Sequence, residues 1–210
     1  MITKLITLLL LATTIANAQN ARSILDKASE AYNKAGGITA SFTLDTKDTK
    51  AKNTYSYDGK ASMKGNKFKL EIPDGITWFD GSNQWVYIKD TDEVNVTNPT
   101  GEELQNISPS AIFSLYKSGF KLAYKGEKKT KGKSVYIVEL TPEKKKAEII
   151  KITVTIDKMS NLFTSITVVN KTGLENTLSI NKMQTGVSLS DVTFAFNKKN
   201  YPGVDVIDLR

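Results

Sequence analysis

The stretch WFDGSNQWVYIKDTDEVNV, which runs from Trp78 to Val96, decides the fold class of this chain. An Asp-Gly turn beginning at Asp80 separates two runs rich in β-branched and aromatic residues, which is the usual signature of a β-hairpin. A second polar turn leads into a third such run at Glu93–Thr97. The stretch therefore predicts a three-stranded antiparallel meander that holds both tryptophans of the chain.

Similar strand patterns extend in both directions from this meander, from Ile38–Leu44 near the start to Val192–Phe196 near the end. We expect about 11 strands, with no internal repeat and no change of composition that would mark a domain boundary. An antiparallel sheet of that length must curl rather than stay flat and open. The sequence thus predicts a mainly β protein built on a single curled antiparallel sheet.

Two helices interrupt the strands. The spacing of Leu25, Ala28 and Tyr32 predicts a helix over Ala21–Ala35 that ends at a Gly-Gly pair. A second helix is expected over Ser108–Ser118, because Ser108 is a good N-cap and the proline that follows fits the first helical position.

The first 18 residues have the composition of a signal peptide. An apolar run, Leu5–Ile15, precedes an Ala-Asn-Ala cleavage site, so we expect residues 1–18 to be removed and residues 19–210 to form one domain. The chain has no cysteine, so no disulfide and no lipid-acceptor residue is expected. A periplasmic, unlipidated protein fits these features.

The chain also has no histidine and carries a net charge of +7. Without His and Cys, the usual zinc and copper sites and the Ser-His and Cys-His nucleophile systems are excluded. We therefore expect a protein that is not an enzyme and has no cofactor or metal. Export argues against nucleic acid as a partner, whereas the positive charge suits phospholipid headgroups or an acidic protein surface.

Three local patterns allow a catalytic or sugar-binding interpretation. Ser114 and Lys117 form a Ser-x-x-Lys motif, but they lie near the end of a short helix and no Ser-Asp-Asn element accompanies them. Asp90, Asp92 and Glu93 could form a glycosidase-like acidic group, but they lie in a tight turn, where Asp is expected for local hydrogen bonding, so a solvated turn is favoured. The aromatic meander could bind sugar, but its apolar neighbours favour a core or a cavity wall.

Two lysine-rich runs, Lys125–Lys133 and Lys144–Lys146, fall between predicted strands. They are interpreted either as solvated hairpin tips or as docking sites for an anionic membrane or an acidic partner.

The order of these features resembles the LolA family of periplasmic outer-membrane lipoprotein carriers. The resemblance rests on ITASFTL at Ile38–Leu44, on the Asp-Gly-x-x-x-Trp-x-Tyr pattern that ends at Tyr87, on the Ser-Pro helix and on the closing FAFNKKNYPGVDVIDLR at Phe194–Arg210. It covers nearly the whole chain after the signal peptide. At the place of a family arginine linked to lid closure, this chain has Gly65 preceded by Lys64, and a lysine cannot reproduce a forked guanidinium hydrogen bond.

The resemblance implies an incomplete, half-open barrel with a helical lid over an apolar cavity. It implies a monomeric carrier that takes acylated lipoproteins from an inner-membrane release transporter and passes them to an outer-membrane acceptor. A lipid- or lipoprotein-binding sensor or transport module of the same fold, with another amphiphilic cargo, is the alternative.

Candidate cavity residues follow from the expected strands, and a register error of one residue would invert the set of each strand. The lid candidates are Ile112, Phe113 and Tyr116. The cavity candidates are Leu70, Ile72, Trp78, Trp85, Val94, Val96, Ile152, Val154, Ile156, Ile166 and Val168.

Overall fold

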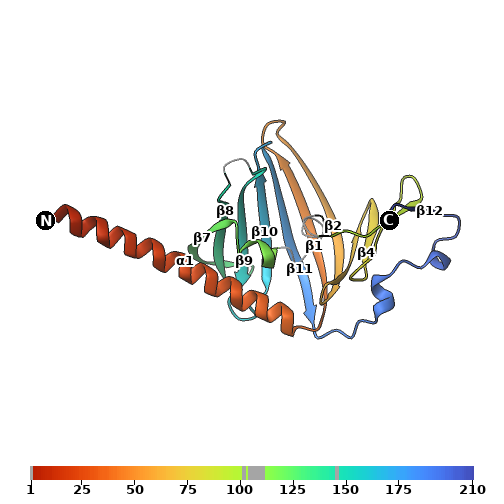
Figure 1. Ribbon diagram of the computed structural model, residues 1–210, viewed down its shortest axis with the longest axis horizontal. Helices are drawn as coiled ribbons and strands as arrows, with labels where there is room; N and C mark the ends of the chain where they lie inside the picture. The colour runs from red at the N-terminus through yellow and green to blue at the C-terminus, as the bar shows by residue number, and fades with distance from the viewer. Residues whose placement is uncertain (1, 101–102, 104–111, 145–146) are drawn as a thin grey trace. The chain divides into compact units, whose positions relative to one another are not determined.

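The structure is a computed structural model that describes residues 2–100, 103, 112–144 and 147–210, with the backbone alone for residues 2–17 and 114. The predicted mainly β class is confirmed, and the sheet has twelve strands in the order β12-β6-β5-β4-β3-β2-β1-β11-β10-β9-β8-β7 (Figure 1). Within the described part of the chain the two outermost strands, β12 and β7, do not pair with each other, so the sheet is not closed into a barrel.

The described chain forms two compact units. Unit 1 comprises Met1–Tyr32, Thr46–Thr54 and Leu115–Leu178, and unit 2 comprises Asn33–Asp45, Tyr55–Ser114 and Ser179–Arg210. Strands β1, β2 and β11 contribute residues to both units.

The strands of the first half are β1 (Gly37–Asp48), β2 (Asn53–Lys64), β3 (Lys67–Ile72), β4 (Gly75–Phe79), β5 (Gln84–Ile88) and β6 (Glu93–Thr97). Those of the second half are β7 (Phe120–Thr130), β8 (Lys133–Pro142), β9 (Ile149–Asp157), β10 (Phe163–Asn170), β11 (Leu174–Thr185) and β12 (Asp205–Asp208). The helical elements are α1 (Ile2–Lys34), α3 (Ile112–Leu115) and the 3-10 turns η1 (Asp191–Phe194) and η2 (Lys198–Asn200).

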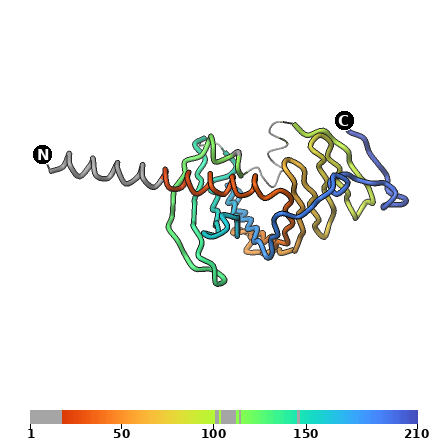
Figure 2. The backbone as a smooth tube through the Cα atoms, turned by 90° about the horizontal axis from the view of Figure 1, so that it is seen from below, coloured from red at the N-terminus to blue at the C-terminus, as the bar shows by residue number. Residues whose placement is uncertain are grey.

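In unit 1, α1 packs on the sheet through the predicted stripe. Leu25 and Ala28 are fully buried, and the ring of Tyr32 lies 5.5 Å from that of Phe163 on β10. Figures 1 and 2 show this half of α1 passing close to the strands of unit 1. The predicted helix over Ala21–Ala35 forms as the second half of α1, which begins at Ile2 and ends at Lys34, just before Gly36 takes a positive φ of 67° that favours glycine.

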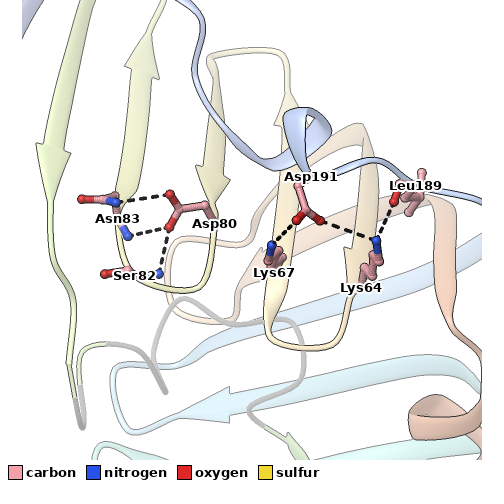
Figure 3. Close-up of polar contacts among 7 residues, drawn as sticks. All are labelled: Lys64, Lys67, Asp80, Ser82, Asn83, Leu189 and Asp191. Carbon is pink, nitrogen blue, oxygen red and sulfur yellow. Dashed lines mark hydrogen bonds and ion pairs between the residues drawn. The ribbon is translucent and has the colours of Figure 1, made fainter.

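In unit 2, the meander of β4, β5 and β6 forms as predicted. The Asp80 carboxylate accepts hydrogen bonds from the backbone N–H groups of Ser82 (2.9 Å) and Asn83 (2.8 Å), which fixes the turn after β4 (Figure 3). These bonds help to hold the Asp80 pKa below its usual value, against the opposing effect of partial burial. Side-chain hydrogen bonds of this kind are the reason that Asp is favoured in such turns.

The predicted last strand, Val192–Phe196, is wrong. The chain forms the 3-10 turn η1 there, and the last strand is β12, which pairs in parallel with β6 in an otherwise antiparallel set of described pairs. Only some apolar residues of this segment pack on the sheet: Phe194 is fully buried and Phe196 contacts Trp78, whereas Val192 is 80% exposed.

Two polar stretches lie largely on strands. Strands β1 and β2 extend into the polar stretch Asp45–Asn53, leaving a turn at its centre. Likewise β7 and β8 extend into the lysine run Lys125–Lys133, so most of its lysines lie on paired strands. Favourable pairing in long hairpins outweighs the polar character of these residues.

Candidate functional site

The register of β3, β4 and β5 assigns every side chain of the meander to one of two faces. Trp78 pairs with Lys69 on β3 and with Trp85 on β5, whereas Leu70 pairs with Thr77. Directly paired residues share a face, and neighbours along a strand lie on opposite faces. Trp78 and Leu70 therefore lie on opposite faces of the sheet, and the cavity candidates of unit 2 do not form one surface.

The face that carries Trp78, Trp85, Val94 and Val96, called the aromatic face below, is covered by the chain's own segment 190–204. The Trp78 ring lies 5.6 Å from Phe196 and 5.7 Å from Tyr201. Val94, Val96 and Val204 form one buried cluster, with Trp85 packed against it. Figure 2 shows the C-terminal segment running past the strands of unit 2. These four cavity candidates are thus packed against the chain's own C-terminal segment.

Two lysines beside the Gly65 turn hold the start of this covering segment. The Nζ of Lys64 donates to the carbonyl oxygen of Leu189 at 2.9 Å, and the Asp191 carboxylate lies 2.9 Å from the Nζ of Lys67 and 3.5 Å from that of Lys64 (Figure 3). The hydrogen bond and charge of Lys67 lower the Asp191 pKa. Lys64, which precedes the position of the family arginine, therefore helps to anchor the C-terminal segment in this chain.

The opposite face, called the Leu70 face below, is apolar. It begins on β1, where the Phe42 ring lies in the space above Gly59 on β2, and continues on β3 and β4, where the Phe68 and Phe79 rings are 5.4 Å apart. By register and strand alternation its members on the parts of β1 to β5 that belong to unit 2 are Ile38, Ala40, Phe42, Leu44, Tyr55, Tyr57, Gly59, Ala61, Met63, Phe68, Leu70, Ile72, Gly75, Thr77, Phe79, Gln84, Val86 and Ile88.

None of these residues is charged, and the carboxylates that the same alternation assigns to this face, Asp48 on β1 and Glu93 on β6, lie at its margins. The other face of the same strands carries several ions. Thr43 donates to Asp58 there at 2.6 Å, and Lys69 pairs with Glu71 at 3.0 Å. Phe42, Phe68 and Phe79 are buried, but other apolar side chains of the Leu70 face keep part of their surface exposed: Leu44, Met63, Leu70, Ile72, Val86 and Ile88. A partly exposed apolar surface on a polar protein points to a binding role.

The candidates of unit 1 lie in its core. Ile152, Val154 and Ile156 are at most 2% exposed. Ile166 and Val168 on β10 pair with Val154 and Ile152, and they are half-buried. Because Phe163, the contact of Tyr32, pairs with Ile156, α1 lies on the face that carries these residues. Their lipid-cavity role stays a prediction.

Among the lid candidates, Ile112 and Tyr116 are buried and Phe113 is half-buried. The Tyr116 hydroxyl donates to the Asp26 carboxylate of α1 at 2.7 Å, and burial together with this hydrogen bond raises the pKa of Tyr116 to about 12. The predicted start of the helix, Ser108, lies outside the described residues. The described helix, α3, is a single turn over Ile112–Leu115. The lid role also stays a prediction.

The catalytic alternatives gain no support from the geometry. The Tyr87 hydroxyl donates to the Asp92 carboxylate at 2.9 Å, and Asp92 has a φ of 53°. Asp92 therefore makes a local hydrogen bond within the turn between β5 and β6. Within the described ranges, no three acidic side chains are placed to hold a metal ion.

The Leu70 face would have been found by counting register from the turn at Pro73–Asp74. A two-residue turn makes Ile72 pair with Gly75, which places Trp78 opposite Lys69 and away from Leu70. The same count, extended to β5, adds Val86 and Ile88, which the sequence analysis missed.

A single open antiparallel sheet with a long N-terminal helix defines the fold class of this chain, and the family comparison agrees. The chain belongs to the family described as outer membrane lipoprotein carrier protein LolA, whose model matches residues 11–173. A comparison with curated proteins gives no match. Among the residues whose placement is described, no helix combines the length and apolar character needed to cross a membrane.

Solved structures with a similar fold include an uncharacterized conserved protein from Thermus thermophilus. It is 11% identical with a TM-score of 0.62, and the match covers 90% of this chain and 99% of that one. An outer membrane lipoprotein-sorting protein domain from Vibrio parahaemolyticus is 13% identical with a TM-score of 0.48, covering 88% and 99%. A LolA superfamily protein from Nitrosomonas europaea is 14% identical with a TM-score of 0.44, covering 84% and 97%.

Proposed function

We propose that this protein is a periplasmic carrier that binds the acyl chains of lipoproteins on the Leu70 face and moves them from the inner to the outer membrane. The observation that carries the proposal is the absence of charge from the unit 2 part of this face on β1 to β5, where Leu70 and Ile72 are partly exposed. Each CH₂ group of an acyl chain gains about 0.8 kcal/mol when it leaves water. Family membership supports the nature of the cargo.

The proposal assigns the two faces different roles. The side chains of Phe196 and Tyr201 cover the aromatic face, so of the two faces the Leu70 face is the one proposed to bind a ligand. The carrier needs no catalytic group, because it only binds and releases. Its partners would be acylated lipoproteins, an inner-membrane release transporter and an outer-membrane acceptor.

Export and processing belong to the same proposal. Cleavage after Ala18 would leave a chain that starts at Gln19, and both residues are exposed in the structure. The intact mass of protein purified from the periplasm tests this directly. A mass that includes residues 1–18 would contradict it.

Native mass spectrometry of that material, followed by solvent extraction, tests the cargo. A lipoprotein bound one-to-one supports the carrier function. A phospholipid or another amphiphile instead favours the alternative module of the same fold. An empty protein that also fails to release lipoproteins from spheroplasts contradicts the carrier function.

The site itself is tested by Leu70→Asp, which places a carboxylate on the apolar face. Ser62→Asp is the matched control, because Ser62 pairs with Lys69 on the opposite face of the neighbouring strand. We expect Leu70→Asp to lose binding of an acyl probe and Ser62→Asp to retain it, both folded by circular dichroism. Equal binding of the acyl probe by both variants would contradict the assignment of the site to the Leu70 face.

A further inference from the structure

The hairpin of β7 and β8 presents lysines on an ordered, rigid tip. Thr130 pairs with Lys133 across a two-residue turn, in which Lys131 and Gly132 have φ values of 50° and 77°. Positive φ at both positions matches the tight turns that suit the twist of a hairpin. The lysines at this end are therefore held at defined positions on the strands and the turn.

The turn between β9 and β10 is fastened to the same tip. The backbone N–H of Lys158 donates to the carbonyl of Ser134 at 3.0 Å, and the Nζ of Lys133 lies 3.3 Å from the Asp157 carboxylate. That carboxylate also accepts the N–H groups of Met159 (2.9 Å) and Ser160 (3.1 Å). These bonds fix the turn that carries Met159 beside the hairpin.

Met159 is 95% exposed at this position. A methionine side chain has a long apolar surface that is ordinarily buried in a core or an interface. Here a network of hydrogen bonds holds its backbone while the side chain projects into solvent next to lysines.

The lysines of this tip divide into paired and unpaired groups. Lys133 pairs with Asp157, and Lys158 pairs with Glu127 at 2.6 Å. In the described part of the chain the remaining three have no acidic partner, and all are exposed: Lys128, Lys129 and Lys131. Glu127 and Asp157 are thus already paired, which leaves a net positive surface at the end of the hairpin, with Lys128 and Lys129 on opposite faces of β7 and Lys131 in the turn.

We propose that this surface, defined as Lys128, Lys129, Lys131 and Met159 and called the basic tip, docks the protein on anionic phospholipid headgroups. Amines attract lipid phosphates, and an apolar side chain among them enters the boundary between headgroups and acyl chains. An acidic protein surface would satisfy the lysines but gives no role to Met159. The inference goes beyond cargo binding, because unit 1 supplies the whole basic tip and the Leu70 face is in unit 2.

Flotation with lipid vesicles tests the proposal, using protein purified from the periplasm. Vesicles of phosphatidylcholine alone are compared with vesicles of equal parts phosphatidylcholine and phosphatidylglycerol, at low salt and at about 0.5 M salt, where charge is strongly screened. The test variant combines Lys128→Gln, Lys129→Gln and Lys131→Gln. The control combines Lys47→Gln, Lys50→Gln and Lys52→Gln, which removes the same charge from the β1–β2 turn region.

We expect wild-type protein to bind the anionic vesicles at low salt and to dissociate at high salt. Since each lysine near an anionic surface contributes about fivefold, the test variant should lose on the order of 100-fold in binding, and the control variant far less. Met159→Ser should lose up to about tenfold. The variants leave the Leu70 face unchanged, so they should still bind the acyl probe. Measuring acyl-probe binding therefore tests the carrier function separately from this proposal.

Equal losses by the test and control variants would overturn the proposal, because they would reflect net charge alone. Binding to neutral vesicles that salt does not weaken would overturn it as well. If wild-type protein fails to bind anionic vesicles at low salt, the membrane is excluded as the partner and an acidic protein surface takes its place.

Discussion

The ring of Phe42 occupies the space that a side chain at Gly59 would need. A Cβ atom at Gly59 would contact Cζ and Cε2 of that ring, and it would stand 2.9 Å from the backbone oxygen of Glu71. This relationship between β1 and β2 starts the Leu70 face. It also explains why a residue with low strand propensity lies in the middle of a strand.

Gly59→Ala should therefore destabilise the protein by about 1–3 kcal/mol, because the added methyl group overpacks a filled site. The free energy of unfolding in urea measures the effect. Phe42→Leu combined with Gly59→Ala should recover part of the loss, so that the double variant is less destabilised than the sum of the two single variants. Additive losses would show that Phe42 does not limit the space at Gly59.

Tyr116→Phe should cost about 0.5–1.5 kcal/mol, because it removes the hydrogen bond from the Tyr116 hydroxyl to Asp26. The effect should depend on pH. Since folding raises the pKa of Tyr116 to about 12, its protonated form is favoured in the folded state, and the contribution is complete below about pH 10.

That contribution should be lost as the pH rises from about 10 to 12. The difference in unfolding free energy between the wild type and Tyr116→Phe, followed against pH, isolates Tyr116 from the other tyrosines. A difference that stays constant across this range would contradict the raised pKa.

Asp191→Asn should loosen the segment that covers the aromatic face, because it removes the ion pairs with Lys67 and Lys64. Faster amide hydrogen exchange in residues 190–204 is the expected result at neutral pH. The lowered pKa of Asp191 means that this contribution is present above its unfolded value of about 4 and disappears as the pH falls below it. Asp205→Asn, an exposed carboxylate of the same region, serves as the control and should leave exchange in 190–204 unchanged.

Val154→Asp should destabilise unit 1 by about 3–5 kcal/mol, because the side chain is fully buried and the new carboxylate has no partner. Ile150→Asp on the same strand is the control, since Ile150 is 46% exposed. Thermal unfolding of both variants measures the difference. A folded Val154→Asp protein of ordinary stability that loses only acyl binding would instead support the predicted cavity role of Val154.

Local patterns predicted most of the sheet, and they failed where packing partners lie far apart in sequence. The Asp80 turn and the strands around it form as expected, because their geometry depends on neighbouring residues. The segment Val192–Phe196 alternates like a strand, but its outcome depends on the aromatic face formed by Trp78, about a hundred residues earlier.

The cavity candidates of the meander are divided between two faces of the sheet for a related reason. Leu70 and Ile72 lie on the apolar face, while the equally apolar Trp78 and Trp85 lie on the other. Hydrophobicity alone does not separate two faces that are both apolar, and a strand's side-chain period of two makes the assignment depend on a single residue of register. The covering segment is what turns the aromatic face into core, and nothing local to the meander indicates it.

The parallel pair of β6 and β12 has a consequence for how the chain folds. Glu93 lies opposite Asp205, so the outermost position of the sheet is filled by a strand that follows β6 by more than a hundred residues. Pairs between such distant segments form slowly, because the entropy of closing a long loop must be overcome first. Until β12 arrives, β6 presents unpaired backbone groups on which a strand of another chain could add. The rate at which β12 docks therefore sets how long the backbone of β6 stays unpaired in a newly made chain.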